Sequence, residues 1–197
     1  MSEQPWTWWT HDGDPERVAM ILPGQGYSAQ APLLSYAASA LADAEWTVRS
    51  FAWSRPSDGR GEAAEIYSRV VRDAVEGAPS ARHLVIGKSL GTLALPLAVE
   101  LGLPGVWLTP LLSENGTAQV RAATLALAGH DAPRALLVGG TKDVLWDAEV
   151  AQGSGADVVE VPGANHSMEI PGDWRRSLEI LGQVTSAVER FASDLEP

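Results

Sequence analysis

The chain has 197 residues, a length typical of one domain with a full hydrophobic core. Its net charge of −11 argues against binding to nucleic acid or to anionic membranes. It contains no cysteine, which excludes a disulfide framework, a thiolate nucleophile and a cysteine-based metal site. No apolar run is long enough to cross a bilayer, and residues 1–5 lack the features of a signal peptide, so we expect a cytoplasmic protein.

Strand-like and helix-like segments alternate along residues 1–197, which predicts one α/β domain with helices on both faces of a mostly parallel sheet. The expected strands are residues 6–10, 18–22, 46–53, 83–86, 105–109, 134–140 and 157–161, the first at a sheet edge. The expected helices are residues 30–43, 62–76, 90–101 (kinked at Pro96), 117–128, 145–151 and 173–193. Functional groups in such sheets gather where the parallel strands end, so the loops after these strands are the places to search.

A G-x-S-x-G motif formed by Gly87, Ser89 and Gly91 lies between an apolar strand and an apolar helix. A strand that turns directly into a helix crowds the positions two before and two after the turn, so only glycine fits there. The serine between them is held in a strained turn, with its hydroxyl exposed above the sheet. The motif therefore predicts that Ser89 is a nucleophile.

A serine hydroxyl needs a base to take its proton, and the base is usually histidine. His166 is the histidine that lies just past a late strand, at the edge of the sheet where Ser89 is expected. A carboxylate must orient this histidine, and Asp143 follows the strand at 134–140. Asp147 is the alternative acid, and the alternative role of Asp143 is to cap the short helix that follows it.

Acyl transfer also requires two backbone N–H donors for the oxyanion. Leu90 is expected to supply one, because it follows the nucleophile at a helix N-terminus. The loop after the second strand is expected to supply the other, from Gln25 or else from Gly26 or Tyr27. Gly24 and Gly26 let the backbone approach a ligand, so we expect this loop, including Tyr27, to contact the substrate. A simple glycine turn is the alternative.

Further residues near the strand ends are candidates for a substrate pocket. Lys88 either attracts an anionic group or points away to pair with a surface carboxylate, and the second alternative is favoured. Trp107 and Trp146, with Leu111 and Leu112, are expected to line an acyl or leaving-group pocket. The alternative is that both tryptophans belong to the ordinary core.

The order Ser89, Asp143, His166, with a glycine loop before them, resembles the α/β-hydrolase superfamily over about residues 17–193. The runs GGTKD, ending at Asp143, and GANH, ending at His166, are similar to its acid and histidine loops. Within it the chain is similar to the compact branch that includes dienelactone-hydrolase-like proteins. The resemblance implies an α/β-hydrolase fold, here with about six or seven strands because the N-terminal part is short. The loop begins with Pro23 and a glycine rather than the frequent His-Gly.

Many members of that superfamily insert a cap domain after the strand that follows the elbow helix. Here only residues 110–116 separate the expected strand at 105–109 from the next helix. We therefore expect a shallow site without a cap.

These features predict a serine hydrolase that cleaves a small-molecule ester or thioester through an acyl-enzyme. Ser89 attacks, His166 transfers the proton, and Asp143 orients the histidine; no metal or organic cofactor is implied. Transfer of the acyl group to an acceptor other than water uses the same residues and stays open, as does the oligomeric state. The alternative is a catalytically silent hydrolase-fold module for binding or scaffolding, and the reactivity of Ser89 distinguishes the two.

Overall fold

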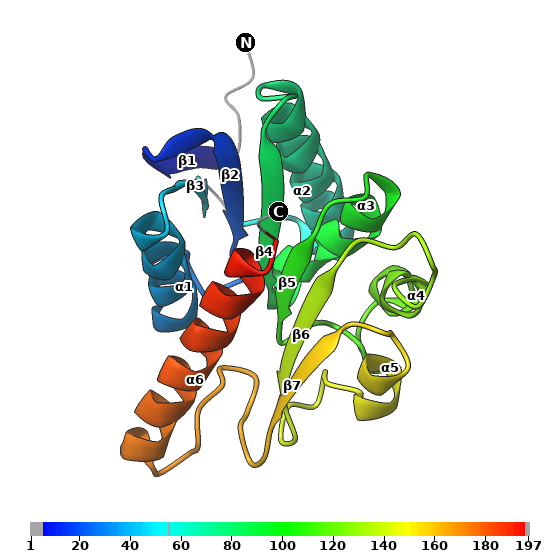
Figure 1. The fold of residues 1–197 in the computed structure, drawn as a ribbon. Coiled ribbons are helices and arrows are strands. Elements are labelled where there is room, and N and C mark those ends of the chain that lie inside the picture. Colours follow the sequence, from blue (N-terminus) through cyan, green and yellow to red (C-terminus); the bar gives the residue numbers. More distant parts are fainter. Residues whose placement is uncertain (1–5, 55, 196–197) are drawn as a thin grey trace.

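The computed structural model describes residues 6–54 and 56–195, and in these residues a seven-stranded sheet carries helices on both faces (Figure 1). The strand order is β1-β3-β2-β4-β5-β6-β7, with β1 antiparallel to β3 and the other neighbours parallel. This confirms the expected fold and the edge position of β1. Residues 1–5, on which the signal-peptide argument relies, lie outside the described residues. The strands are β1 (Trp6–His11), β2 (Asp14–Leu22), β3 (Trp46–Trp53), β4 (Arg82–Lys88), β5 (Gly105–Leu108), β6 (Ala135–Gly140) and β7 (Asp157–Val161).

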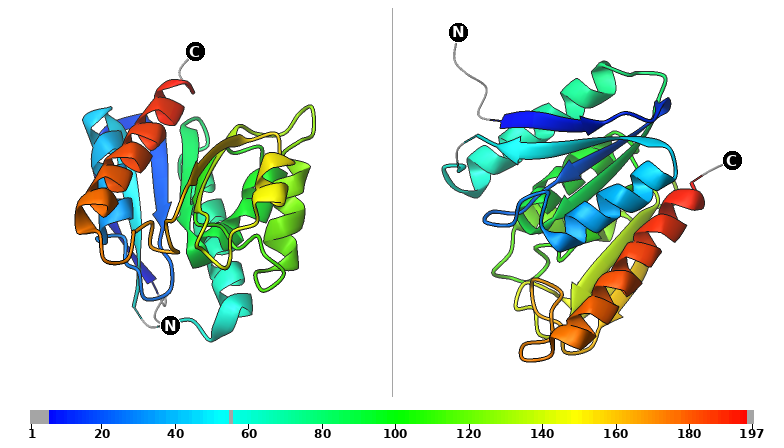
Figure 2. Two further views of the ribbon diagram at one scale, coloured as in Figure 1. Left: turned by 90° about the horizontal axis from the view of Figure 1, so that it is seen from below. Right: turned by 90° about the vertical axis from the view of Figure 1, so that its left-hand side faces the viewer.

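The helices divide between the two faces of the sheet, as the views of Figure 2 show. One face carries α1 (Pro32–Asp43) and α6 (Trp174–Ser193), which pack on each other. The other face carries α2 (Gly59–Glu76), α3 (Leu95–Glu100), α4 (Ala118–Ala126) and α5 (Ala148–Gln152). Three helices, α4, α5 and α6, begin after a capping side chain. Thr117, Asp147 and Asp173 each accept a hydrogen bond from the backbone N–H three residues on.

The prediction of a single kinked α-helix over residues 90–101 is wrong. The chain instead makes a 3₁₀ helix, η1 (Ser89–Ala94), before the short α3 begins at Leu95. Pro96 explains the break, because proline has no N–H to donate and is tolerated only in the first turn of an α-helix. Gly102 ends the segment with a φ of +66°, as a helix stop requires.

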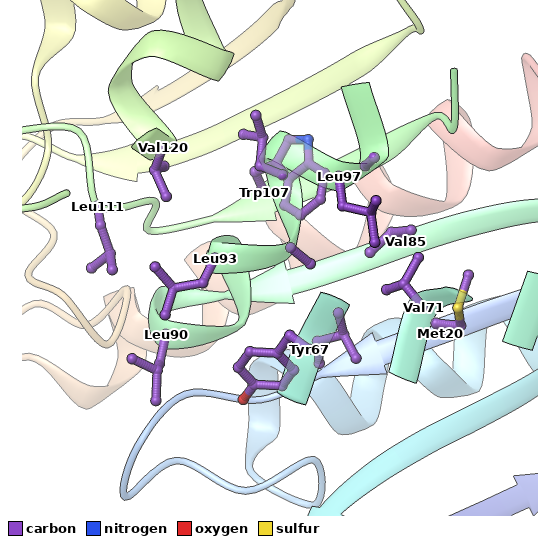
Figure 3. Packing of buried hydrophobic residues seen from close by; sticks show 14 of the residues in the cluster. Met20, Tyr67, Val71, Val85, Leu90, Leu93, Leu97, Trp107, Leu111 and Val120 are labelled. Atoms are coloured by element: carbon purple, nitrogen blue, oxygen red, sulfur yellow. The ribbon is translucent and has the colours of Figure 1, made fainter. Parts of the chain in front are cut away.

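Two apolar layers hold the helices on the sheet. Alternate residues of β4 enter different layers: Leu84 and Ile86 face α1 and α6, whereas Val85 faces α2 and α3. Figure 3 shows the second layer, to which Val85, Leu93 and Trp107 belong. Each large side chain that is fully buried stabilises the fold by about 1.5–3 kcal/mol. These layers fix the ends of β4, β6 and β7, from which the site is built.

The carboxyl edge of the sheet carries no cap domain in the described chain. The segment between β5 and α4, residues 109–117, forms neither helix nor strand, as the sequence predicted. None of the helices within residues 6–54 and 56–195 has the length and apolar character needed to cross a membrane.

Candidate active site

Ser89 lies in a strained elbow directly after β4. Its φ is +51°, in the left-handed region that residues other than glycine rarely adopt. A Cβ on Gly87 would lie 2.7 Å from the carbonyl oxygen of Gly91. A Cβ on Gly91 would lie 2.0 Å from the carbonyl oxygen of Leu22, at the end of β2. Both glycines of the motif are therefore required by close backbone approach.

A chain of two hydrogen bonds joins Ser89, His166 and Asp143. His166 Nε2 lies 2.7 Å from Ser89 Oγ, and His166 Nδ1 lies 2.7 Å from Asp143 Oδ2. The Asp143 side chain is 0% exposed and the His166 side chain is 33% exposed. The two hydrogen bonds therefore link a buried carboxylate to an accessible imidazole and then to the serine. The other Asp143 oxygen accepts from the Leu145 N–H at 2.9 Å. In this arrangement the imidazole can take the serine proton while the carboxylate fixes its tautomer.

Asp147, the alternative acid, is engaged elsewhere. Its Oδ1 accepts from the Val150 N–H at 3.1 Å, so Asp147 is the helix cap that was the alternative role of Asp143. Its Oδ2 lies 2.5 Å from Arg121 Nη1, and this hydrogen bond lowers the pKa of Asp147. The structure therefore brings Asp143 to His166 and places Asp147 with α4 and α5.

The other three histidines, all among the described residues, do not bond to Ser89. His11 is exposed at the end of β1, His83 is buried at the start of β4, and His130 is exposed beside Asp131. Across residues 6–54 and 56–195, no three His, Cys, Asp or Glu side chains gather in a way that could hold a metal ion.

The loops that carry the acid and the histidine are joined to each other. Lys142 N–H donates to the Ala164 carbonyl at 3.0 Å, and Gly163 N–H donates to Thr141 Oγ1 at 2.8 Å. A Cβ on Gly140 would lie 2.2 Å from the same Ala164 oxygen. The glycine at the end of β6 thus lets the histidine loop pack onto the acid loop.

Asn165 shapes the histidine loop, a role that the sequence analysis missed. Its Oδ1 accepts from the backbone N–H of Ser167 at 2.9 Å and of Glu169 at 3.1 Å. The turn closed in this way buries Met168 at a φ of +60°. An asparagine that bonds to the backbone two residues on is a known turn former, and its position just before His166 was the available signal.

Residues 23–27 form a tight turn beside the nucleophile, which we call the glycine turn. Gly24 and Tyr27 pair as an isolated bridge, with Gln25 and Gly26 between them and Gly26 at a φ of +69°. A Cβ on Gly24 would lie 3.2 Å from Ser89 Cβ, so the turn touches the elbow. The structure thus brings the second predicted donor segment to Ser89.

Lys88 does not point to the surface, and the favoured prediction for it is wrong. The residue is 3% exposed, and its Nζ lies 4.6 Å from the centre of the Tyr27 ring. Lys88 follows Ile86 on the α1 and α6 face of β4, where the glycine turn covers it. Burial lowers the pKa of Lys88 to about 8, and the nearby Asp143 carboxylate opposes this shift.

The predicted pocket tryptophans are packing residues in the structure. Trp107 is buried in the apolar layer under α2 and α3 (Figure 3). Trp146 lies in the same layer, and its Nε1 donates to Glu160 Oε2 at 2.7 Å. Leu111 and Leu112 are also buried there. The alternative of an ordinary core role therefore describes both tryptophans.

A cavity of about 370 Å³ lies beside the glycine turn, between residues 23–30 and the end of β3 at Trp53. Gly24 forms part of its wall and packs beside Ser89, whereas Ser89 and His166 are not among the residues that line the cavity. A larger hollow of about 470 Å³ lies over β1, β3 and α1, and its described lining includes no predicted site residue. The smaller of these two cavities is therefore the one that lies beside the glycine turn.

No family model matches the chain, and no curated protein does. Solved structures do. An α/β serine hydrolase homologue from Coxiella burnetii aligns over 92% of this chain and 91% of its own, with 15% identity and a TM-score of 0.67. An α/β serine hydrolase without a lid from Xanthomonas campestris aligns over 94% and 89%, with 18% identity and a TM-score of 0.62. Est1E from Butyrivibrio proteoclasticus, solved with ferulic acid bound, aligns over 96% and 94%, with 16% identity and a TM-score of 0.69. The described residues thus have the α/β-hydrolase fold, and among them there is no cap domain.

Proposed function

We propose that this protein is a serine hydrolase that cleaves a small ester or thioester through an acyl-enzyme. The observation that carries the proposal is the hydrogen-bonded chain from the buried Asp143 through His166 to Ser89. The strained backbone of Ser89, which presents its hydroxyl at the end of β4, supports it further. The fold of solved serine hydrolases that the chain shares is a third support.

In the acylation half-reaction, Ser89 Oγ attacks the carbonyl carbon of the substrate while its proton passes to His166 Nε2. Asp143 stabilises the imidazolium through Nδ1. The backbone N–H groups of Leu90 and Gln25 hold the oxyanion of the tetrahedral intermediate. The intermediate then collapses, the C–O or C–S bond breaks, and the alcohol or thiol leaves with the proton from His166.

In the deacylation half-reaction, water takes the place of the leaving group. His166 removes a proton from the water as it attacks the acyl carbon, and a second tetrahedral intermediate forms. Its collapse releases the carboxylic acid and returns the proton to Ser89. The same steps with another acceptor in place of water give acyl transfer.

We propose a small, neutral substrate. The cavity of about 370 Å³ beside Gly24 and Tyr27 has room for one modest substituent. A net charge of −11 disfavours the approach of anionic esters through the long-range field. Gly24, Gly26 and Tyr27 are the proposed contacts.

Intact-mass labelling with a neutral fluorophosphonate tests the proposal. Wild type is expected to gain one adduct, Ser89→Ala none, and His166→Ala to react about 1,000-fold more slowly, because the base is lost. Ser39→Ala and His130→Ala, which change exposed residues away from the site, are the matched controls and should label like wild type. An adduct that persists in Ser89→Ala, or no adduct on folded wild type, would overturn the proposal.

A further inference from the structure

The glycine turn makes few contacts of its own at its tip. Gln25 and Gly26 are exposed, and no atom of the described residues lies within 4 Å of a Cβ built on Gly26. The N–H of Gln25 is nevertheless the group that we place at the oxyanion. Its position therefore depends on how the two ends of the turn are held.

The first end is held from α2 and β3. The Tyr67 hydroxyl, buried at the face of α2, donates to the Pro23 carbonyl and accepts from Trp53 Nε1 at 3.2 Å. Figure 3 shows the Tyr67 ring reaching from α2 across the apolar layer, with its oxygen at the layer's edge. This contact fixes the peptide plane that enters the turn.

The second end is held at Tyr27, from two directions. The Tyr27 hydroxyl accepts from the Leu33 N–H at 3.0 Å, in the first turn of α1. The Lys88 ammonium lies against the face of the Tyr27 ring, 4.6 Å from its centre. A cation over an aromatic face is attracted by the ring quadrupole, and more strongly when both are withdrawn from water. Lys88 is the residue before the nucleophile, so this contact joins the elbow directly to the turn.

We propose that Lys88 is a positioning residue that holds the glycine turn against the elbow through the Tyr27 ring, and so keeps the Gln25 N–H in place for the oxyanion. The inference rests on the proposed function. Its consequence is specific: loss of the Lys88 charge weakens stabilisation of the transition state more than it weakens binding of a neutral substrate.

The charge of Lys88 is itself sensitive to pH. Burial lowers the pKa of Lys88 to about 8, while the Asp143 carboxylate, from the loop after β6, favours the charged form. The Tyr27 ring that it faces stays neutral over this range, because burial and the Glu169 carboxylate raise the pKa of Tyr27. The positioning contact is therefore made below about pH 8 and lost above it.

Steady-state hydrolysis of a neutral p-nitrophenyl ester, at pH 7, tests the contact. Lys88→Met and Tyr27→Leu are each expected to lower kcat about 10-fold, and Tyr27→Leu is also expected to raise KM, because the Tyr27 ring is a proposed substrate contact. The double variant should be no slower than Tyr27→Leu alone, because Tyr27→Leu already removes the contact that Lys88→Met removes, together with the hydroxyl bond to the Leu33 N–H. Arg175→Met, which removes an exposed cation lying 4.3 Å from the Trp174 ring centre, is the matched control and should keep the wild-type kcat.

A pH profile separates this role from a merely structural one. Wild-type kcat should fall through an alkaline limb near pH 8, whereas Lys88→Arg should keep its activity there, because a guanidinium stays charged. Lys88→Met should lack the limb. A limb unchanged in Lys88→Arg and Lys88→Met would overturn the proposal.

The outcomes also separate this inference from the proposed function. If wild type is labelled at Ser89 and Lys88→Met keeps the wild-type kcat, the positioning role fails and the hydrolase stands. If Lys88→Met raises KM for an anionic ester alone, Lys88 is a substrate-binding residue, which also overturns the inference. Absence of labelling in wild type rejects the hydrolase itself.

Discussion

The nucleophile elbow and the glycine turn touch each other, but they are held in place by different means. The elbow is held by backbone against backbone, with Gly91 pressed onto the end of β2 at Leu22. The glycine turn is held through side chains: the Tyr67 hydroxyl of α2 donates to Pro23, the Lys88 ammonium of β4 lies against the Tyr27 ring, and the Tyr27 hydroxyl accepts from the backbone of α1. Substitutions that add atoms should therefore disrupt the elbow, whereas substitutions that remove anchoring side chains should release the turn.

Gly91→Ala should have the largest effect on stability. The new methyl group would lie 2.0 Å from the Leu22 carbonyl oxygen, so β2 and η1 would have to move apart. We expect a loss of about 4 kcal/mol or more in the free energy of unfolding, measured by urea denaturation. Gly182→Ala in α6, where no described atom is within 4 Å, is the matched control and should stabilise slightly. A folded Gly91→Ala protein with normal stability would contradict the account of the elbow.

Lys88→Met should reveal the unfavourable burial of the lysine charge. The pKa of Lys88 is lowered to about 8 in the folded state, so between pH 8 and 10.5 the unfolded chain binds more protons. The wild type should therefore become more stable relative to Lys88→Met as pH rises over this range, by at most about 3 kcal/mol. Urea denaturation of both proteins at several pH values measures the difference. A difference that is constant or falls with pH would show that Lys88 is not buried as a charge.

Tyr67→Phe should weaken the other end of the glycine turn. The buried Pro23 carbonyl and the partly buried Trp53 Nε1 would both lose their partner, which lowers the free energy of unfolding by about 2 kcal/mol. We also expect slower labelling of Ser89, because the turn is released. Tyr36→Phe, at an exposed tyrosine, controls for loss of a hydroxyl. Wild-type labelling by a destabilised Tyr67→Phe would show that the turn does not depend on this anchor.

Gly26→Ala should have the smallest effect, and it sharpens the contrast with Gly91. Position 26 favours glycine because of its φ of +69° and not because of steric crowding. Beyond its two chain neighbours, no described atom lies within 4 Å of the added methyl group. The expected loss is about 1 kcal/mol, the cost of the left-handed conformation for an ordinary residue. Thermal unfolding measures it. A loss as large as that of Gly91→Ala would contradict the distinction between steric and conformational glycines.

The difference between the two regions also explains what the sequence could predict. The elbow depends on local spacing, so a G-x-S-x-G motif between a strand and a helix was sufficient to predict it. Asp143 and His166 were found because both follow strands that end at the same edge of the sheet, and the structure brings them to Ser89. The order of strands and helices followed in the same way from apolar patterns along the chain.

The anchors of the glycine turn were not predictable from local patterns. Tyr67 lies 44 residues from Pro23 in the sequence, and nothing in α2 indicates that its hydroxyl reaches a loop. The favoured prediction pairs Lys88 with a surface carboxylate, and only the fold shows that the glycine turn covers it. A pocket role is predicted for Trp107 and Trp146, with an ordinary core role as the alternative, because they lie in or after elements near the expected site; the sequence does not show which face of each element points inward.

The most direct test of the account is a crystal structure of the protein after reaction with a neutral fluorophosphonate. The adduct on Ser89 imitates the tetrahedral intermediate, so its phosphonyl oxygen reports where the oxyanion is held. We expect this oxygen to lie about 3 Å from the backbone nitrogens of both Leu90 and Gln25, with Lys88 still against the Tyr27 ring. An oxygen that contacts Leu90 alone, with the glycine turn displaced or facing away, would contradict it.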